Sequence, residues 1–484
     1  MSLTYKCREM MRRWHSLLLA AALLCSGAPA AAQDEKDPPA EWTRPDTVRL
    51  EGAGAFAHPK LMPGEDALYI TAHTVYHPQL VGNPSLVNGS ERYQSSTSLW
   101  AGQVTDLRFK NVTALPQPSG DFLYLYPEGE VGPEGVFHLA WAEANPDSVA
   151  KRQSLADRVP AKEVYYARFG QEAWFPPEGI YRSEGTEEIW GGAANVRWGR
   201  DQKGTFQLGP DGTPHFVLNH QWRGSMVHVW KRSRGAWQID TIRYDPKARA
   251  RLTAANRNVP IGSSCDLAIG ESGRLALAYS ASRTAKGLSS NEVRVAHTSD
   301  GGDTWKRTTI LDPKQRINNE KGSGSVRHLE LTGRPGDTLH VVWGRKISEL
   351  TFSAQELWHA WSADGGETWT TTSPIDLPEN GHLDDLEMVT GSNGTPHVLV
   401  HLGGGKDNDA STSDLLHTRW RPERGWAELQ ALTLASKHVH GATFAVWGGR
   451  LHLLWSQTPL PFKYTSPVTI LRRSHPLPSK STSE

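Results

Sequence analysis

SADGGETW, at residues 362–369, has a near-copy upstream in the same sequence, TSDGGDTW, at residues 298–305. Both stretches read Ser/Thr-x-Asp-x-Gly-x-Thr-Trp and follow a β-like run, and Trp305 and Trp369 are 64 positions apart. In a tight turn an Asp side chain accepts hydrogen bonds from backbone amides, and Gly supplies a positive φ angle. The Trp then returns on the next strand and packs between sheets. The sequence therefore predicts two copies of one strand–turn–strand unit.

The same unit recurs without the Asp, and its tryptophans keep a regular spacing. The series is Trp174, Trp237, Trp305, Trp369 and Trp426. A Gly-containing turn followed by a β-like run precedes each of them, as in GTPHFVL at residues 212–218 and GTPHVLV at residues 394–400. Repetition at a fixed period is typical of folds in which one supersecondary unit is copied around a centre, and about seven copies fit the chain. The prediction is an all-β, seven-bladed β-propeller of four-stranded antiparallel blades, with a six-bladed propeller as the alternative.

The order of strands within a blade follows from these runs. An apolar run before the Gly turn is predicted as strand one, the run after that turn as strand two, the run before the Trp as strand three, and the Trp opens strand four. Residues 467–472 are predicted as the last third strand, and the tail offers no good fourth one. The run DTVRL at residues 46–50 is predicted to complete that blade and to close the ring.

The N-terminus has the features of a secretory signal peptide. Basic residues precede an apolar core at residues 17–24, which is too short to span a membrane, and three alanines at residues 30–32 offer a cleavage site. The predicted domains are therefore a signal peptide at 1–32 and a single β-propeller at 33–484. The mature protein is predicted to be secreted or periplasmic, monomeric, and without a membrane span.

Charge and cysteine content exclude two further classes. The chain has 52 Lys and Arg against 52 Asp and Glu, whereas a general nucleic-acid binder is usually basic. Of the three cysteines, Cys265 alone follows the predicted leader, so an internal disulfide is excluded. Cys265 lies in an apolar run and is predicted to be a core residue.

The two full turns resemble the Asp-box (BNR repeat) of the sialidase-like β-propeller superfamily. In that family the box lies between the third and fourth strands of a blade, on the face away from the active site. The resemblance implies a propeller whose ligands bind at the opposite mouth, formed by the loops between strands two and three and those entering strand one. The chain departs from sialidases at two places: His58 stands where their first-blade Arg-Ile-Pro motif has Arg, and SSCD at residues 263–266 lacks the Glu of their fourth blade.

Polar residues gather at the predicted mouth. His, Tyr and carboxyl groups transfer protons, paired carboxylates serve glycoside hydrolysis, and Arg binds a sugar carboxylate in bidentate fashion. The predicted catalytic residues are His220, His328, Asp384, Asp385 and His440. The predicted substrate-binding residues are His58, His73, Tyr76, Arg197, Trp222, Arg223, Arg283, Arg327, Arg345, His382 and His401. A long loop is predicted to carry His73 and Tyr76.

Three functions remain open on the sequence alone. The first is an exported glycoside hydrolase that cleaves an acidic glycan, the second a polysaccharide lyase that acts on uronate with His, Tyr and Arg chemistry, and the third a lectin-like or protein-binding propeller.

No cofactor and no metal are predicted. Five histidines recur at one place in the repeat and are therefore interpreted as structural; they are His138, His215, His340, His397 and His452. The run DND at residues 407–409 could hold calcium through oxygen ligands, but a solvated loop is the prediction.

Overall fold

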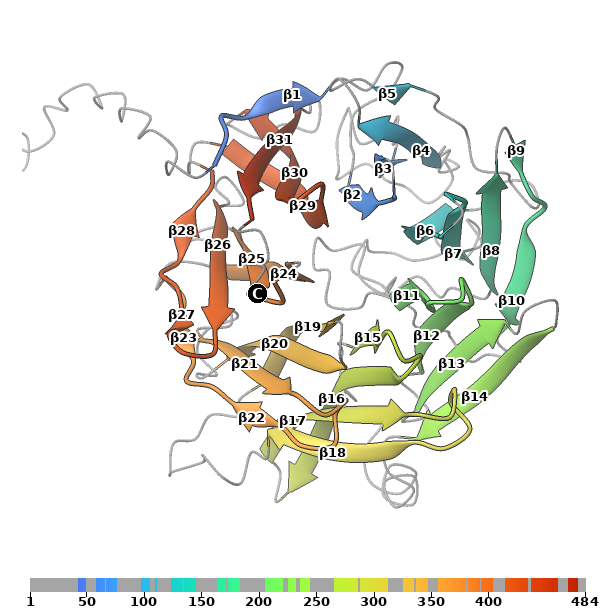
Figure 1. Ribbon diagram of the computed structural model, residues 1–484, viewed down its shortest axis with the longest axis vertical. Coiled ribbons are helices and arrows are strands. Elements are labelled where there is room, and N and C mark those ends of the chain that lie inside the picture. The colour runs from blue at the N-terminus through green and yellow to red at the C-terminus, as the bar shows by residue number, and fades with distance from the viewer. Residues whose placement is uncertain are drawn as a thin grey trace, which may run out of the picture. The chain divides into compact units, whose positions relative to one another are not determined.

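The computed structural model describes residues 42–48, 58–65, 67–75, 97–104, 109–110, 123–133, 135–144, 163–170, 173–182, 205–220, 225–231, 236–243, 265–285, 288–311, 325–334, 337–346, 356–378, 382–391, 393–403, 414–433, 437–459 and 469–477. These residues belong to one compact unit, Glu41–Glu484, and the predicted signal peptide lies outside them. Every regular element among them is a β-strand (Figure 1). This part of the chain has no helix that is long and apolar enough to cross a membrane.

The strands form antiparallel sheets, numbered here in chain order and written from the inner strand outward. Sheets 1 to 4 are β2 (His58–Pro63), β3 (Leu68–Val75), β4 (Thr97–Val104), β5 (Phe109–Lys110); β6 (Leu123–Val131), β7 (Phe137–Ala144), β8 (Glu163–Gly170), β10 (Glu178–Arg182) with β9 (Ala173–Trp174) on β8; β11 (Thr205–Leu208), β12 (Pro214–His220), β13 (Ser225–Lys231), β14 (Trp237–Arg243); and β15 (Cys265–Ile269), β16 (Leu275–Ala285), β17 (Leu288–Thr298), β18 (Lys306–Leu311). Sheets 5 to 7 are β19 (Ser325–Arg334), β20 (Thr338–Lys346), β21 (Glu356–Ser362), β22 (Thr370–Thr371) with β23 (Ile375–Asp376) on β21; β24 (His382–Thr390), β25 (Pro396–Gly403), β26 (Asp414–Arg421), β27 (Gly425–Trp426) with β28 (Gln430–Ala431) on β26; and β29 (Lys437–Trp447), β30 (Arg450–Pro459), β31 (Thr469–Pro476), β1 (Asp46–Val48).

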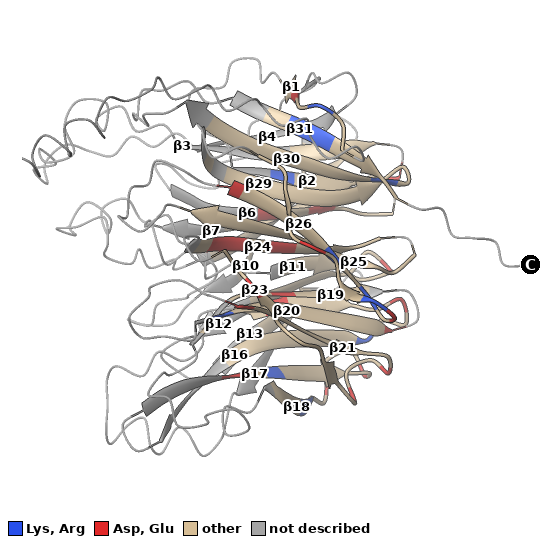
Figure 2. Cartoon of the chain, turned by 90° about the vertical axis from the view of Figure 1, so that its left-hand side faces the viewer, with Lys and Arg blue, Asp and Glu red and all other residues tan. Residues whose placement is uncertain are grey.

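The sheets are arranged around a common centre (Figure 1). Their inner strands β2, β6, β11, β15, β19, β24 and β29 contact one another in that order, and β29 contacts β2 again. Figure 2 shows the strands from the side, with acidic residues on β24. The described residues therefore form an all-β propeller of antiparallel sheets, as the repeat predicted.

The two repeated turns have the predicted geometry. They join β17 to β18 and β21 to β22, and Gly301 and Gly365 have φ angles of +74° and +72°. In the second turn the Asp364 carboxylate accepts from the Thr368 amide at 2.9 Å and from the Thr368 hydroxyl at 2.6 Å. The Gly365 amide also donates to the Asp337 carbonyl, in the turn from β19 to β20, at 3.0 Å. The starts of the inner strands consequently lie at the opposite face.

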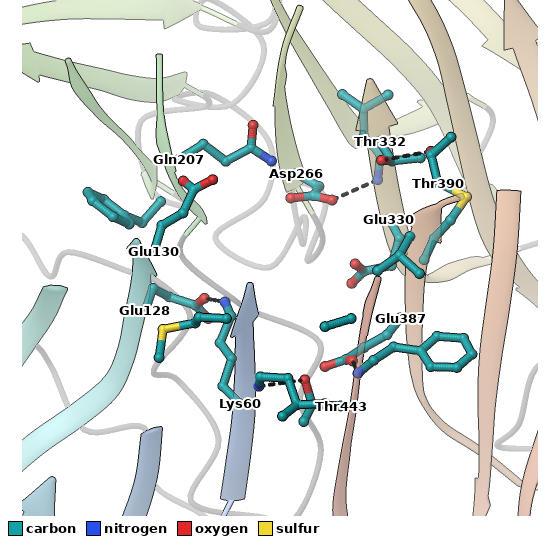
Figure 3. Close-up of a pocket in the computed structure, with 18 of the residues that line it drawn as sticks. Lys60, Glu128, Glu130, Gln207, Asp266, Glu330, Thr332, Glu387, Thr390 and Thr443 are labelled. Atoms are coloured by element: carbon teal, nitrogen blue, oxygen red, sulfur yellow. Dashed lines mark hydrogen bonds and ion pairs between the residues drawn. The ribbon is translucent and has the colours of Figure 1, made fainter. Parts of the chain in front are cut away.

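Polar side chains link each inner strand to the next one (Figure 3). Inner strands are sheet edges, so their amides need acceptors outside their own sheet. Side-chain oxygens accept from amides in five links: Glu130 from Leu208 at 2.5 Å, Gln207 from Ile269 at 3.0 Å, Asp266 from Leu331 at 2.7 Å, Glu387 from Phe444 at 2.7 Å, and Thr443 from Leu61 at 3.2 Å. Two links join side chains: Lys60 with Glu128, and Thr390 with Thr332 at 3.1 Å. The links run from β2 round to β29 and back to β2.

The recurring histidines bond across strands, which confirms their structural role. In sheets 3, 5 and 6 the Nδ1 atom of a second-strand His lies 3.1 Å from the Nε2 atom of a third-strand His. The three pairs are His215–His228, His340–His359 and His397–His417. In sheet 2 the third-strand residue is a Tyr, and His138 Nδ1 lies 2.6 Å from the Tyr166 hydroxyl. In sheet 7 the third-strand residue is Arg472, which lies 2.9 Å from His452 Nδ1.

The third-strand residue of a pair also packs against the repeated Trp of the next sheet. Ring centroids are 5.2 Å apart for Tyr166 and Trp237, 5.6 Å for His228 and Trp305, and 5.3 Å for His359 and Trp426, each pair edge to face. Burial of these rings between sheets is the packing that the Trp series predicted.

The N-terminal strand completes sheet 7. β1 pairs antiparallel with β31, with Asp46 opposite Arg472 and Val48 opposite Ile470, which is the pairing predicted for this run; residues 49–50 lie outside the described residues. The strand β31 continues beyond residue 472, where the prediction ended it, because β30 keeps pairing with it back to Arg450.

Trp42 takes the place in sheet 7 that the repeated Trp has elsewhere, and the sequence analysis missed it. Its side chain is 4% exposed, meets the His417 ring edge to face at 5.4 Å, and stacks on Phe444 at 6.4 Å. The rest of its sheet lies at the other end of the chain, so no local spacing could reveal this Trp.

Trp42→Ala should lower the free energy of unfolding by about 3–5 kcal/mol, the usual loss for a buried Trp. Urea unfolding followed by Trp fluorescence measures it. Phe175→Ala is the control, because that ring is 49% exposed, and exposed positions usually change stability by less than about 0.5 kcal/mol. If Trp42→Ala unfolds at the wild-type urea concentration, Trp42 does not fasten sheet 7.

Candidate active site

Three neighbouring inner strands carry a β-bulge near their start. The register with the second strand shifts between Arg327 and Leu329 in β19, between Leu383 and Asp385 in β24, and between Val439 and Gly441 in β29. The extra residues are His328, Asp384 and His440, three of the five predicted catalytic residues. A bulge turns its extra residue out of the ladder, and bulges are frequent next to active sites. A further shift lies in β6, between Leu125 and Glu128.

His328 and Asp385 meet from neighbouring sheets. His328 Nδ1 lies 3.9 Å from Asp385 Oδ1, and the two residues are 7% and 4% exposed. His328 also has a φ angle of +45°, a left-handed conformation that costs a non-glycine residue about 1–2 kcal/mol. Such strain persists where the surroundings over-determine it, as at active sites. The pair therefore holds an imidazole in one orientation beside a carboxylate that can stabilise its charged form.

Asp385 also lies opposite a second buried histidine. Its partner in the register of β24 and β25 is His401, and residues directly opposite on antiparallel strands have neighbouring side chains on one face. His401 is buried, whereas Asp384, the bulged neighbour of Asp385, is half-exposed. Two adjacent aspartates thus stand in different surroundings.

Arg345 is held at the same end of sheet 5. It lies opposite Val326 of β19 and opposite Glu356 of β21. Its Nη1 atom is 4.0 Å from Glu356 Oε2, and its guanidinium lies over the Trp358 ring at 5.5 Å. Trp358 Nε1 donates to the same Glu356 oxygen at 2.6 Å. A guanidinium fixed by a carboxylate and an aromatic face is suited to binding an anionic group.

A cavity of about 440 Å³ opens inside the ring of inner strands, and His328 and Asp385 are among the residues that line it. Figure 3 shows Lys60, Glu130, Asp266, Glu330 and Glu387 around it. Burial raises the pKa of Glu130 to about 7, although the hydrogen bond from the Leu208 amide and the charge of Lys60 both lower it. The predicted catalytic and substrate-binding residues include none of these carboxylates, because the carboxylates come from strands of different sheets and share no spacing along the sequence.

The other predicted residues fall into two groups. The described strands contain the backbone, without a described side chain, of His58, His73, His220, Arg283, Arg327, His382 and His440. Tyr76, Arg197, Trp222 and Arg223, and the run at 407–409, lie outside the described residues.

One placement was wrong: His73 lies within β3, not in a loop, because β3 continues to pair with β2 as far as His58. That register sets His58 and His73, both predicted to bind substrate, directly opposite each other.

Cys265 is buried and has no disulfide partner, as predicted for a core residue. Within the strands and turns that the structure describes, no three His, Cys, Asp or Glu side chains are grouped so as to hold a metal ion.

No protein-family model and no curated protein matches the sequence. Among solved structures, the chain is similar to a protein of unknown function from Dyadobacter fermentans (13% identity, covering 73% of this chain and 95% of that one, TM-score 0.44). It is also similar to the NanB sialidase of Streptococcus pneumoniae (11%, 89% and 70%, TM-score 0.41) and to an ulvan lyase bound to a GlcA(1-4)Rha3S unit (13%, 68% and 79%, TM-score 0.44). A sialidase, a member of the class that the two boxes resemble, is thus among the solved structures to which the chain is similar.

Proposed function

We propose that this protein is an exported enzyme that cleaves glycosidic bonds, with its active site where β19, β24 and β29 bulge. The observation that carries the proposal is the buried pair of His328 and Asp385, from two sheets, with strain stored in the His328 backbone. The cavity beside the pair, about 440 Å³, lies within the range of about 300–1,000 Å³ usual for small-molecule sites.

Each residue of the site has a chemical part in this proposal. His328 transfers the proton, because imidazole is the commonest general acid and base at neutral pH. Asp385 fixes the ring of His328 and stabilises its charged form. Asp384 supplies the carboxylate that hydrolysis needs on the other side of the scissile bond. His220 and His440 stay candidates for proton transfer, and the predicted substrate-binding residues stay candidates for holding the sugar chain.

Elimination is the second candidate reaction, and Arg345, anchored by Glu356 and Trp358 on the strand next to that of His328, supplies the cation that it needs. In elimination His328 would take the proton next to a uronate carboxylate, Arg345 would neutralise that carboxylate, and the bond to the leaving sugar oxygen would break as a C=C bond forms. The leaving oxygen then takes the proton back from the His328 imidazolium, which restores the neutral ring. An acidic glycan, proposed here as the substrate, suits both reactions.

The remaining features of the proposal concern the whole chain. Each of the sheets 1 to 7 is taken as one blade, which gives seven blades rather than six; the links that return from β29 to β2 support this count. The leader at 1–32 is removed on export, to the periplasm or the medium, and the propeller at 33–484 acts as a monomer.

A panel of purified glycans tests the function. Incubation of the mature protein with neutral, sialylated and uronate-containing glycans should release new reducing ends from at least one of them. A rise in ultraviolet absorbance together with the reducing ends identifies elimination, since an unsaturated uronate forms. Binding of a glycan without any product would instead identify a lectin and overturn the enzyme proposal.

A further inference from the structure

The carboxylate of Asp384 lies directly over the Cα atom of Gly403, the last residue of β25. A Cβ atom added at Gly403 would contact all three carboxyl-group atoms of Asp384, with Cγ at 2.5 Å and Oδ1 at 2.8 Å and Oδ2 nearer still. Real Cβ atoms essentially never approach another atom more closely than about 3.0 Å. The position occupied by this carboxylate therefore exists because residue 403 has no side chain.

Backbone conformation gives no other reason for glycine at this place. Gly403 does not belong to the glycines with a positive φ angle, so an alanine would fit the β-strand backbone. Gly403 pairs with His382 in the register, two residues before Asp384. The glycine and the β24 bulge are thus adjacent parts of one arrangement, in which the bulge turns Asp384 out and Gly403 receives its carboxylate.

The two adjacent aspartates have different surroundings. Asp385 is buried against His328, stands opposite His401 and lines the cavity, whereas Asp384 is half-buried and lies against Gly403, outside that lining. We propose that Asp384 is the catalytic carboxylate that meets the glycan, that Asp385 acts through His328, and that Gly403 is a positioning residue that seats Asp384. The inference rests on the proposed function and assigns separate roles within that site.

Gly403→Ala tests the positioning role with little risk to folding, because the atoms that must move are the end of one half-exposed side chain. The variant should keep its affinity for the glycan and lose about 10²-fold in kcat, the usual effect of a reacting group displaced by about 1 Å. Asp384→Asn should lose at least as much. The double variant Gly403→Ala/Asp384→Asn should have the same kcat as Asp384→Asn alone, because the carboxylate that Gly403 positions is already absent.

Gly270→Ala is the matched control. A Cβ atom there would also meet an aspartate carboxylate, Asp337 Oδ1 at 2.5 Å, but at the face of the repeated turns. The kcat of Gly270→Ala should equal that of the wild type. Additive losses in the double variant, or an Asp384 carboxylate unmoved in the crystal structure of Gly403→Ala, would overturn the positioning role. The crystal structure does not depend on turnover, so failure of the glycan panel and failure of this inference are distinguished.

Discussion

His328→Gly is expected to lower kcat by about 10²–10⁴-fold, the usual contribution of a general acid or base, and to unfold less readily than His328→Ala. Both variants lose the imidazole beside Asp385. They differ in the backbone, because residue 328 has a φ angle of +45°, which glycine tolerates and alanine does not. The glycine variant should therefore be more stable by about 1 kcal/mol.

This order of the Gly and Ala variants reverses the usual one. A protein with glycine inside a strand is normally less stable than the same protein with alanine there, by roughly 0.5–1 kcal/mol. Thr332, farther along β19 and absent from the positive-φ residues, is the control position: Thr332→Ala should be more stable there than Thr332→Gly. Urea unfolding and kcat on the glycan identified by the panel provide the two measurements. A His328→Gly enzyme within tenfold of wild-type turnover would remove His328 from the chemistry.

The fold could be predicted from the sequence because its signals are local. Asp364, Gly365 and Trp369 fall within one short stretch, and the Asp364 carboxylate bonds the Thr368 amide four residues on. The same turn recurs at a fixed spacing, so the antiparallel order of strands followed from one copy. The structural histidines were recognisable for the same reason, since His215 and His397 each stand three positions after the Gly of their turn.

The site could be predicted in its residues but not in its geometry. His328 and Asp385 were found as polar residues at the predicted mouth, yet their pairing depends on two register shifts, against β20 and β25. A register shift is set by contacts between strands, and no spacing along one strand encodes it. Two further contacts also join residues of different strands and could not be predicted from spacing. Glu356 anchors Arg345 from the third strand, and Gly403 lies against Asp384 of the neighbouring strand.

Acid should unfold this protein well above the pH at which carboxylates titrate, because the His–His pairs are neutral when folded. Burial lowers the pKa of His228 and of His397 to about 3, and that of His215 to about 4; the pKa values of His359 and His417 are also lowered by burial. The hydrogen bond within each pair needs one unprotonated ring nitrogen as acceptor. If both histidines of a pair were protonated, the bond would be lost and two charged rings would be buried away from water.

The sign of the effect follows from proton counts. Below about pH 6.5 the unfolded chain binds protons at these histidines and the folded chain does not. The contribution of these histidines to the free energy of unfolding is therefore fully present above pH 6.5. It is lost as the pH drops from 6.5 toward 3–4, by roughly 1.4 kcal/mol per pH unit for each such histidine. The five paired histidines whose pKa values are lowered would together remove a typical free energy of unfolding of about 5–15 kcal/mol before pH 4.

Urea unfolding at intervals from pH 8 to pH 4.5 measures this slope, and the double variant His215→Asn/His228→Gln isolates one pair in which both pKa values are lowered. The variant should be less stable than the wild type at pH 8, since it loses the 3.1 Å bond. Its free energy of unfolding should fall less steeply with acid, by the share of two histidines, roughly 2.7 kcal/mol per pH unit. His297→Gln is the control, because His297 stands opposite Ala276 rather than another histidine and its pKa is lowered by burial but raised by Glu367; its slope should change less. A wild-type stability that stays level from pH 7 to pH 5 would mean that the paired histidines accept protons without leaving the fold.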